Sequence, residues 1–246
     1  MSRDIEKYAA DYLADDFEKI MSQYRKELII SRLYKYHAKR ILDIGPAYNF
    51  CFRDYREYEK YVIVEPSLLM CQNIEPAKNV EIINNKIENV VLQLKKMNFD
   101  FVIASGLLHE VEDEIVFLDA IKEICCSETI VHISVPNSNS FHLRFAREAG
   151  MIPRLGELTD YSRKMQRCRT YQRKSFNAAL TGRGFSIVEE GSFFLKFFNQ
   201  SKMQQCVESN ILDDALLAAL AQMGEWIPDA AAEIWTDVQF EGRDDA

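Results

Sequence analysis

The stretch from residue 39 to residue 66 constrains the fold more than any other part of the chain. It contains two short apolar segments, at 41–44 and 61–64, that are typical of strands. Gly45 follows the first segment, where the absence of a Cβ lets a ligand approach the backbone. Glu65 ends the second segment, about twenty residues later, where nucleotide-binding sheets hold a ribose by its hydroxyls. The pattern therefore predicts the opening unit of a nucleotide-binding α/β sheet.

The length and charge of the chain limit the classes of protein to consider. The chain has 246 residues, of which 48% are hydrophobic and 28% charged, and this suits one domain (1–246) with a full core. The 30 basic and 38 acidic residues give a net charge of −8. Because phosphate neutralisation dominates nucleic-acid affinity, this charge disfavours a nucleic-acid partner and favours a small molecule.

The cysteine, histidine and hydropathy patterns mainly exclude other classes of protein. The six cysteines form no CxxC pair and the four histidines are scattered, so we expect neither a metal site nor disulfides. The N-terminus is charged and the longest apolar runs have the length of strands, which argues against a signal peptide or a membrane helix. These patterns predict a cytoplasmic protein with no membrane partner.

The first turn of the predicted sheet carries a family motif. Asp43 and Gly45 match the start of an acid-x-Gly-x-Gly-x-Gly pattern, while Ala47 and Asn49 stand at the next two glycine places. The chain thus resembles the class I S-adenosylmethionine-dependent methyltransferases, and within them the small-molecule O-methyltransferases. The resemblance implies a Rossmann-like, seven-stranded α/β sheet with an antiparallel last strand, and S-adenosylmethionine as the cofactor.

The same resemblance assigns the cofactor-binding residues. Glu65 would bind the ribose, and Pro66 would lie beside the adenine. Lys86 stands where many relatives carry an acid that accepts a hydrogen bond from the adenine amino group, which a lysine cannot do. The backbone of Ile87 could still donate to the adenine, and Asn85 could replace the missing acceptor. The expected cofactor-binding residues are Asp43, Gly45, Pro46, Ala47, Glu65, Pro66, Met70, Lys86, Ile87 and Ser105.

A second match to the family follows the fourth predicted strand. Residues 99–113 read FDFVIASGLLHEVED, where the family has Phe-Asp-x-Val and then Leu-His-His-Val with an acid. Ligands of open α/β sheets bind at the carboxyl ends of strands, so this stretch should line the cleft. A hydroxyl acceptor needs its proton removed by a group that titrates near neutrality. His109 is the nearest such group, with Glu110 and His142 next, and the alternative for His109 is a structural histidine at a helix end.

The insertion at 137–170 is expected to recognise the acceptor. It begins with Asn137 in a Pro-Asn turn, where relatives often place substrate contacts. The overlapping stretch 143–174 has nine basic and three acidic residues, which reverses the sign of the whole protein. Such a run is usually a solvated helix face. Its position instead predicts a small anionic acceptor that is held by arginines, with Arg144 and Arg147 as candidates.

The two ends of the chain are expected to be helical. Apolar residues at helical spacing predict a cap of two helices within 1–38, in which Tyr12 either closes over the site or packs in the core. A hairpin is predicted at 185–198, with its second strand, 192–198, as the antiparallel seventh strand. The Rossmann-like core would then span 39–198, followed by a C-terminal helical extension at 199–246.

The expected reaction is transfer of a methyl group to an oxygen, or less readily a nitrogen, of a small polar acceptor of the polysaccharide-precursor or natural-product type. Two other functions stay open at this point. Ala47, Asn49 and Lys86 depart from the family's cofactor pattern, so the chain could be a methyltransferase-like binding subunit without turnover. The second alternative is a nicotinamide-dependent oxidoreductase. A homodimer is also left open.

Overall fold

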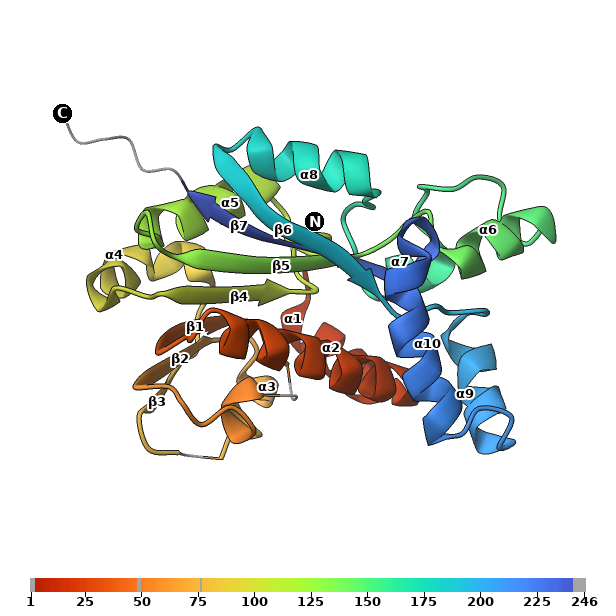
Figure 1. Ribbon diagram of the computed structural model, residues 1–246, viewed down its shortest axis with the longest axis horizontal. Coiled ribbons are helices and arrows are strands. Elements are labelled where there is room, and N and C mark those ends of the chain that lie inside the picture. Colours follow the sequence, from red (N-terminus) through yellow and green to blue (C-terminus); the bar gives the residue numbers. More distant parts are fainter. Residues whose placement is uncertain (1–2, 48–49, 76, 241–246) are drawn as a thin grey trace.

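One mixed sheet organises the chain, of which the computed structural model describes residues 3–47, 50–75 and 77–240. Its seven strands lie in the order β3-β2-β1-β4-β5-β7-β6 (Figure 1). β1 to β5 are parallel, and β7 is antiparallel to both β5 and β6. The strands are β1 Arg40–Ile44, β2 Lys60–Val64, β3 Val80–Ile83, β4 Phe101–Ser105, β5 Ile130–Pro136, β6 Phe185–Phe193 and β7 Glu233–Phe240. The expected seven-stranded, Rossmann-like sheet with an antiparallel strand is confirmed.

The position of the seventh strand was predicted wrongly. The sequence indicated a hairpin whose second strand spans 192–198, but β6 runs on to Phe193 and the chain then leaves the sheet. The antiparallel strand is β7, which lies within the segment expected to be a helical extension. β7 was missed because buried carboxylates interrupt its apolar pattern: Glu233 and Asp237 are 5% and 0% exposed. The sheet therefore extends to residue 240, and only part of 199–246 is helical.

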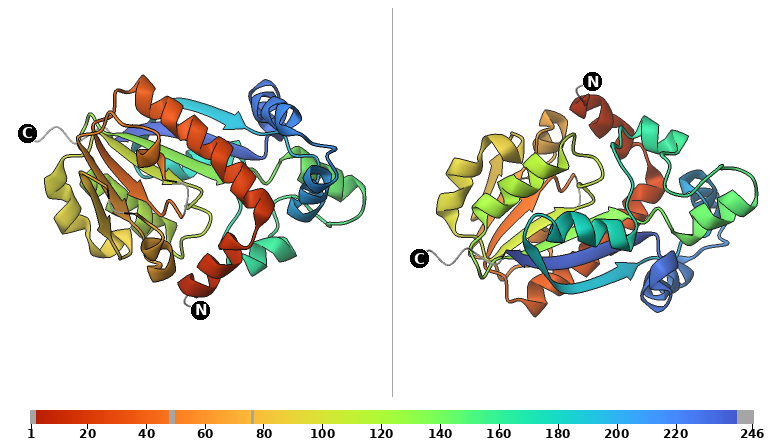
Figure 2. Two further views of the ribbon diagram at one scale, coloured as in Figure 1. Left: turned by 90° about the horizontal axis from the view of Figure 1, so that it is seen from below. Right: turned by 90° about the horizontal axis from the view of Figure 1, so that it is seen from above.

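Helices cover both faces of the sheet. Figure 2 shows α2 across one face in the left view, and α5 and α8 across the other face in the right view. The two N-terminal helices fall inside the expected cap, and each begins at an aspartate, Asp4 or Asp15, whose side chain accepts a hydrogen bond from the first turn. The helices are α1 Ile5–Leu13, α2 Asp16–Lys35, α3 Leu68–Gln72, α4 Val91–Leu94, α5 Glu114–Ile124, α6 Phe141–Glu148, α7 Asp160–Lys164, α8 Arg173–Thr181, α9 Gln200–Glu208 and α10 Asp214–Trp226.

The parallel strands are apolar on both faces because helices cover both. Leu42 and Val62 pack in the cluster that contains residues of α5 and α8. Their neighbours Ile41 and Ile63 point the opposite way and pack against α2. All four side chains are fully buried, and each such burial contributes roughly 1.5–3 kcal/mol. This double packing fixes the register of the strands and therefore the alignment of their carboxyl ends.

α9 and α10 are inserted between β6 and β7 and pack beside the N-terminal half of α2 (Figure 1). Phe17 and Met21 of α2 share an apolar cluster with residues of both helices. Gly224 lets α10 approach the chain that leaves β6, since an added Cβ would lie 2.2 Å from the backbone N of Phe194. The insertion thereby places the loop between β6 and α9 next to the carboxyl ends of the sheet.

Candidate active site

The carboxyl ends of β1, β2 and β4 open into a cavity of about 340 Å³, which α1 and α2 cover. All ten residues expected to bind the cofactor line it, from Asp43 to Ser105. The structure therefore brings together the set that the family motifs indicated. Asn49, the remaining motif position, lies outside the described residues.

The turn after β1 has the backbone that its glycine predicted. Gly45 has φ +59° and donates its N–H to the carbonyl of Val64 at 2.9 Å. An added Cβ there would lie 2.9 Å from Leu107 Cδ2. Ala47, at a glycine place of the motif, also has a positive φ of 57°, a conformation that costs an alanine more than a glycine. The loop thus keeps a left-handed shape despite the substitution.

Two buried carboxyl groups lie at this edge. Glu65 is 6% exposed and accepts a hydrogen bond from the N–H of Ser67 at 2.9 Å. Asp43 is 2% exposed and accepts one from the hydroxyl of Tyr61 at 2.5 Å. Burial raises the pKa of each to about 7. Of the two, Asp43 lies within β1, whereas Glu65 directly follows the last residue of β2.

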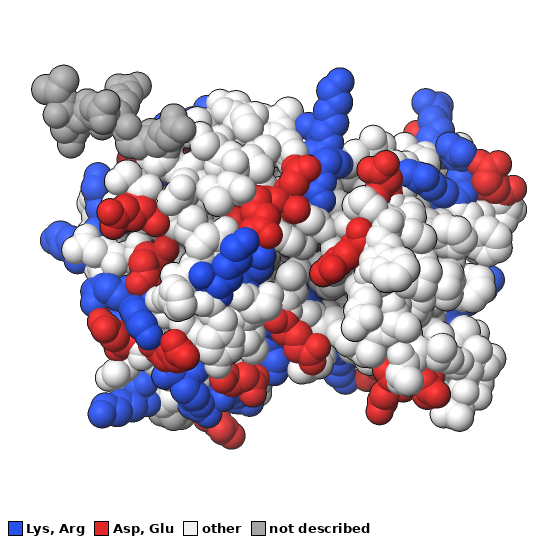
Figure 3. Space-filling model, in the orientation of Figure 1, with Lys and Arg blue, Asp and Glu red and all other residues white. Residues whose placement is uncertain are grey.

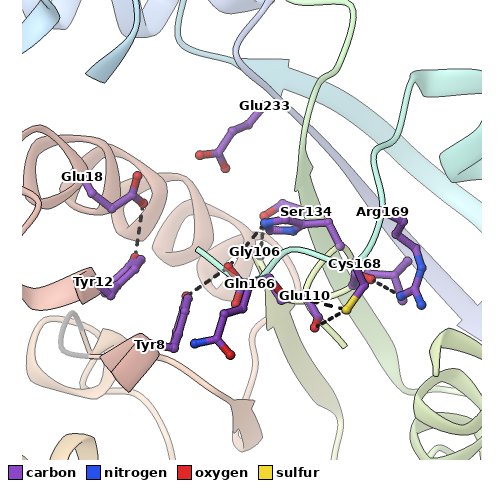
Figure 4. Close-up of polar contacts among 12 residues, drawn as sticks. Tyr8, Tyr12, Glu18, Gly106, Glu110, Ser134, Gln166, Cys168, Arg169 and Glu233 are labelled. Carbon is purple, nitrogen blue, oxygen red and sulfur yellow. Dashed lines mark hydrogen bonds and ion pairs between the residues drawn. The ribbon is translucent and has the colours of Figure 1, made fainter. Parts of the chain in front are cut away.

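α1 forms one wall of the cavity and is fastened on both sides. Glu6 accepts hydrogen bonds from the N–H of Leu68 at 2.7 Å and from the hydroxyl of Ser67 at 3.0 Å. On the other side, Tyr12 lines the cavity and donates to Glu18 at 3.2 Å (Figure 4). Tyr12 was expected to contact the acceptor; its ring lies on the wall of the larger cavity, which holds the cofactor-binding residues.

Glu110 is an anchor for α1. Its carboxylate accepts hydrogen bonds from Arg3 Nη2 at 2.6 Å and from the hydroxyl of Tyr8 at 3.0 Å. Burial acts to raise the pKa of Glu110, but contact with His109 and the charge of Arg3 outweigh it and lower the pKa to about 2. A carboxylate of this pKa is a weak base near neutrality, so Glu110 is a poor candidate for proton removal.

His109 lies where two cavities meet. It lines both the larger cavity and a second one of about 100 Å³. The side chain is 4% exposed, and neither ring nitrogen has a hydrogen-bond partner among the described residues; Nε2 lies 3.5 Å from Glu110 Oε1. Burial lowers the pKa of the imidazole and so favours its neutral form. A neutral, unpartnered imidazole can accept a proton from a bound ligand.

The second cavity contains some of the residues expected in the acceptor site. His142 and Asn137 line it. His142 hydrogen-bonds the hydroxyl of Ser140 at 3.0 Å, and burial lowers its pKa well below the usual value. The Asn137 amide donates to the carbonyl of Ala231 at 3.0 Å, so it also joins the β5 end to the segment before β7.

The two arginines expected to bind the acceptor do not line either cavity. Arg144 donates to the carbonyl of Asn139 at 2.8 Å, and Arg147 pairs with its neighbour Glu148. In Figure 3, basic and acidic side chains are mixed over the α6 end of the molecule. From the same basic stretch, Arg167 and Arg169 line the second cavity instead. Arg169 donates hydrogen bonds to backbone carbonyls at 108–112, beside His109.

Several site residues were not found from the sequence. Glu18 of α2 and Glu233 of β7 border both cavities (Figure 4). Arg25 bridges them, with Nη2 at 2.9 Å from Glu18 Oε1 and Nε at 2.9 Å from Glu233 Oε2. Lys196 lines the second cavity from the loop before α9. One signal was available, since Lys196 is the only charged residue in the aromatic run FFLKFF at 193–198.

Comparisons with known proteins agree with this architecture. A family model described as a methyltransferase domain matches residues 9–190. Among solved structures, a SAM-dependent methyltransferase from Archaeoglobus fulgidus has a TM-score of 0.55 at 15% identity, covering 92% of this chain and 100% of its own. An S-adenosylmethionine-dependent methyltransferase from Mesorhizobium loti has a TM-score of 0.51 at 14% identity, covering 81% and 90%.

The plantazolicin methyltransferase BamL, in complex with a triazolic desmethylPZN analogue and SAH, has a TM-score of 0.56 at 12% identity, covering 97% of this chain and 98% of its own. At these identities the likeness shows the fold alone. No curated protein matches the chain in sequence. None of the helices in the described part of the chain has both the length and the apolarity needed to cross a membrane.

The sheet order and the cleft at its carboxyl edge define a Rossmann-like protein of the class I methyltransferase type. The match to the family model covers most of the chain, and the chain belongs to the methyltransferase family. The resemblance to the class I S-adenosylmethionine-dependent methyltransferases is confirmed. The alternative of a nicotinamide-dependent oxidoreductase is wrong.

Proposed function

We propose that this chain is a cytoplasmic, S-adenosylmethionine-dependent methyltransferase that acts on a hydroxyl oxygen of a small anionic acceptor. The observation that carries the proposal is the place of His109, between the cavity lined by the cofactor residues and the second, smaller cavity. An acceptor in the second cavity would meet the methyl donor at this junction. The small volume of the second cavity favours a small-molecule acceptor.

The larger cavity suits the cofactor. Gly45 and the carboxyl group of Glu65 line this cavity at neighbouring strand ends, where a nucleoside with its ribose would be held. S-adenosylmethionine supplies a methyl group that is already activated by its sulfonium. The task of the protein is therefore mainly to align the acceptor oxygen.

His109 would assist the acceptor. Its neutral ring has a free nitrogen that can take the hydroxyl proton while the oxygen becomes methylated. The pair formed by Arg3 and Glu110 holds α1 in place, so it acts on the walls of the site and not on the proton. In this proposal Glu110 is a positioning residue, and His142 borders the acceptor.

The anionic character of the acceptor is supported by Arg167. Its guanidinium stacks 5.3 Å from the ring of Tyr161 and has no hydrogen-bonded or ion-paired side-chain partner among the described residues. Arg167 borders both cavities, beside His109. A guanidinium that is not paired with a carboxylate can bind an oxyanion of a ligand through two parallel hydrogen bonds. This role replaces the one expected for Arg144 and Arg147.

The cofactor is tested by thermal unfolding. We expect S-adenosylhomocysteine at about 100 times its dissociation constant to add roughly 2.7 kcal/mol to the free energy of unfolding. For a chain of this size the melting temperature should rise by about 5–10 °C. NAD at the same concentration should give no shift, and a shift with NAD alone would contradict the proposal. Cofactor binding without methylation of any acceptor would instead favour the inactive binding subunit.

Glu65→Ala tests the ribose contact. Since hydrogen bonds to a charged group contribute roughly 1.5–3 kcal/mol, the affinity for S-adenosylhomocysteine should fall by roughly tenfold to a hundredfold in calorimetry. An unchanged affinity would place the ribose elsewhere.

The same contact predicts a pH dependence. Burial raises the pKa of Glu65 to about 7, and the ionised form is the better acceptor for ribose hydroxyls, so affinity should increase from pH 6 to pH 8. Asp43 titrates in the same range, and Glu65→Gln separates the two. The increase should be smaller in Glu65→Gln than in the parent; an equal increase would assign it to Asp43.

A further inference from the structure

Lys196 is a buried cation that forms no ion pair with the residues that the structure describes. It is 9% exposed, and its ammonium donates one hydrogen bond, to Gln200 Oε1 at 2.7 Å. Among the described residues it has no ion pair. An ammonium can donate three hydrogen bonds. The remaining donors are available to a ligand in the second cavity, which Lys196 lines. Buried charges are normally paired, because desolvation without a counterion is costly.

The acidic side chains around this cavity are already engaged. Glu18 accepts from Arg25 at 2.9 Å and from Gln200 at 3.0 Å. Glu233 pairs with the same arginine through both of its oxygens. Glu157, at the outer side, lies 3.5 Å from Arg154. None of these carboxylates lies within ion-pair distance of the two cations that face the cavity, Lys196 and Arg167.

We propose that Lys196 and Arg167 together bind a doubly charged oxyanion of the acceptor, a phosphate monoester being the group of this charge that a small cavity admits. Neither cation forms an ion pair with any residue that the structure describes, and both border a space of about 100 Å³. The guanidinium offers a planar fork and the ammonium offers its remaining donors to the same group. This inference rests on the proposed function, since it names the class of acceptor, and it adds Lys196 as a specificity-determining residue.

The electrostatic surroundings of Lys196 give the proposal a pH signature. Burial lowers the pKa of the ammonium to about 8. The charged and titratable groups that act on Lys196 are Glu18, Arg167, Glu233, Asp15 and His142. Across the cavity lie also His109, Glu157, Tyr161 and Arg169. Because the protonated ammonium binds the anion, the affinity for the phosphate dianion should fall as the pH rises through 8. Lys196→Arg remains charged, so its affinity should persist at pH 9.

The test uses calorimetry with inorganic phosphate as the probe and the full chain saturated with S-adenosylhomocysteine. At pH 7.5 we expect phosphate to bind, and Lys196→Met and Arg167→Met to weaken it by roughly tenfold to a hundredfold. Lys202→Met, an exposed lysine on the adjoining helix α9, is the matched control and should bind phosphate like the parent. Acetate carries one charge, so its affinity for the parent should be lower than that of phosphate by about tenfold or more.

Several results would overturn the proposal. They are an absence of phosphate binding, equal affinity for phosphate and acetate, and unchanged phosphate affinity in Lys196→Met. If Lys196→Met does not fold, loss of the parent's affinity at pH 9 together with its retention in Lys196→Arg supports the proposal, and equal behaviour of the two proteins contradicts it. Methylation of an acceptor whose only charged group is one carboxylate would refute this inference alone, whereas phosphate binding without S-adenosylhomocysteine binding would refute the proposed function alone.

Discussion

His109→Ala should lower the turnover of the enzyme by roughly 10²–10⁴-fold, the range typical for loss of acid-base catalysis. The affinity for S-adenosylhomocysteine should stay nearly intact, because the ring adds no charge to the larger cavity in its neutral form. The measurement is methyl transfer from labelled S-adenosylmethionine to an acceptor identified by mass spectrometry of copurifying ligands.

The reason for this large effect is the isolation of the ring. His109 is buried between the two cavities, and neither of its ring nitrogens has a hydrogen-bond partner among the described residues. Glu110, by contrast, is hydrogen-bonded to Arg3 and Tyr8. His142→Ala is the matched control. His142 borders only the second cavity, so its loss should mainly raise the Michaelis constant for the acceptor. Full turnover in His109→Ala would mean that solvent or His142 removes the proton of the acceptor hydroxyl.

The cofactor half of the site could be predicted because its residues lie at or shortly after the ends of strands. Parallel strands end at one edge of the sheet, so short motifs after β1, β2, β3 and β4 become neighbours without any knowledge of distant packing. The turn at Gly45 and the acid at Glu65 are local features of this kind. The positions of the strand ends were therefore enough to predict the residues that line the larger cavity at this edge of the sheet.

The acceptor half could not be predicted in the same way. Glu18, Lys196 and Glu233 come from α2, the loop before α9 and the start of β7, and they meet only because α9 and α10 pack beside α2. Placing the seventh strand at 192–198 moved Lys196 into the sheet and left Glu233 in a helical tail. Charge composition pointed to the basic stretch, but it could not tell which arginines face inward. That depends on partners such as the Asn139 carbonyl.

The second large effect concerns Arg25, which we expect to be essential for stability. Its side chain is 13% exposed and lies between Glu18 and Glu233, with hydrogen bonds of 2.9 Å to each. Arg25→Met would leave two buried carboxylates without their shared cation. Removing one member of a buried ion-pair network typically costs about 3–5 kcal/mol. In urea unfolding, the midpoint should fall with little change in slope, as a loss of stability without a change in exposed surface requires.

Two variants distinguish the loss of this cation from a general effect of substitution. Arg25→Lys keeps the charge but loses the fork that reaches both carboxylates, so its loss of stability should be intermediate. Lys19→Met removes an exposed pair with Asp16 on the same helix, and should change stability by about 1 kcal/mol or less. If Arg25→Met were as stable as Lys19→Met, Glu18 and Glu233 would have to be protonated or solvated. The wall shared by the two cavities would then be open to water, and the alignment of acceptor and cofactor would need another support.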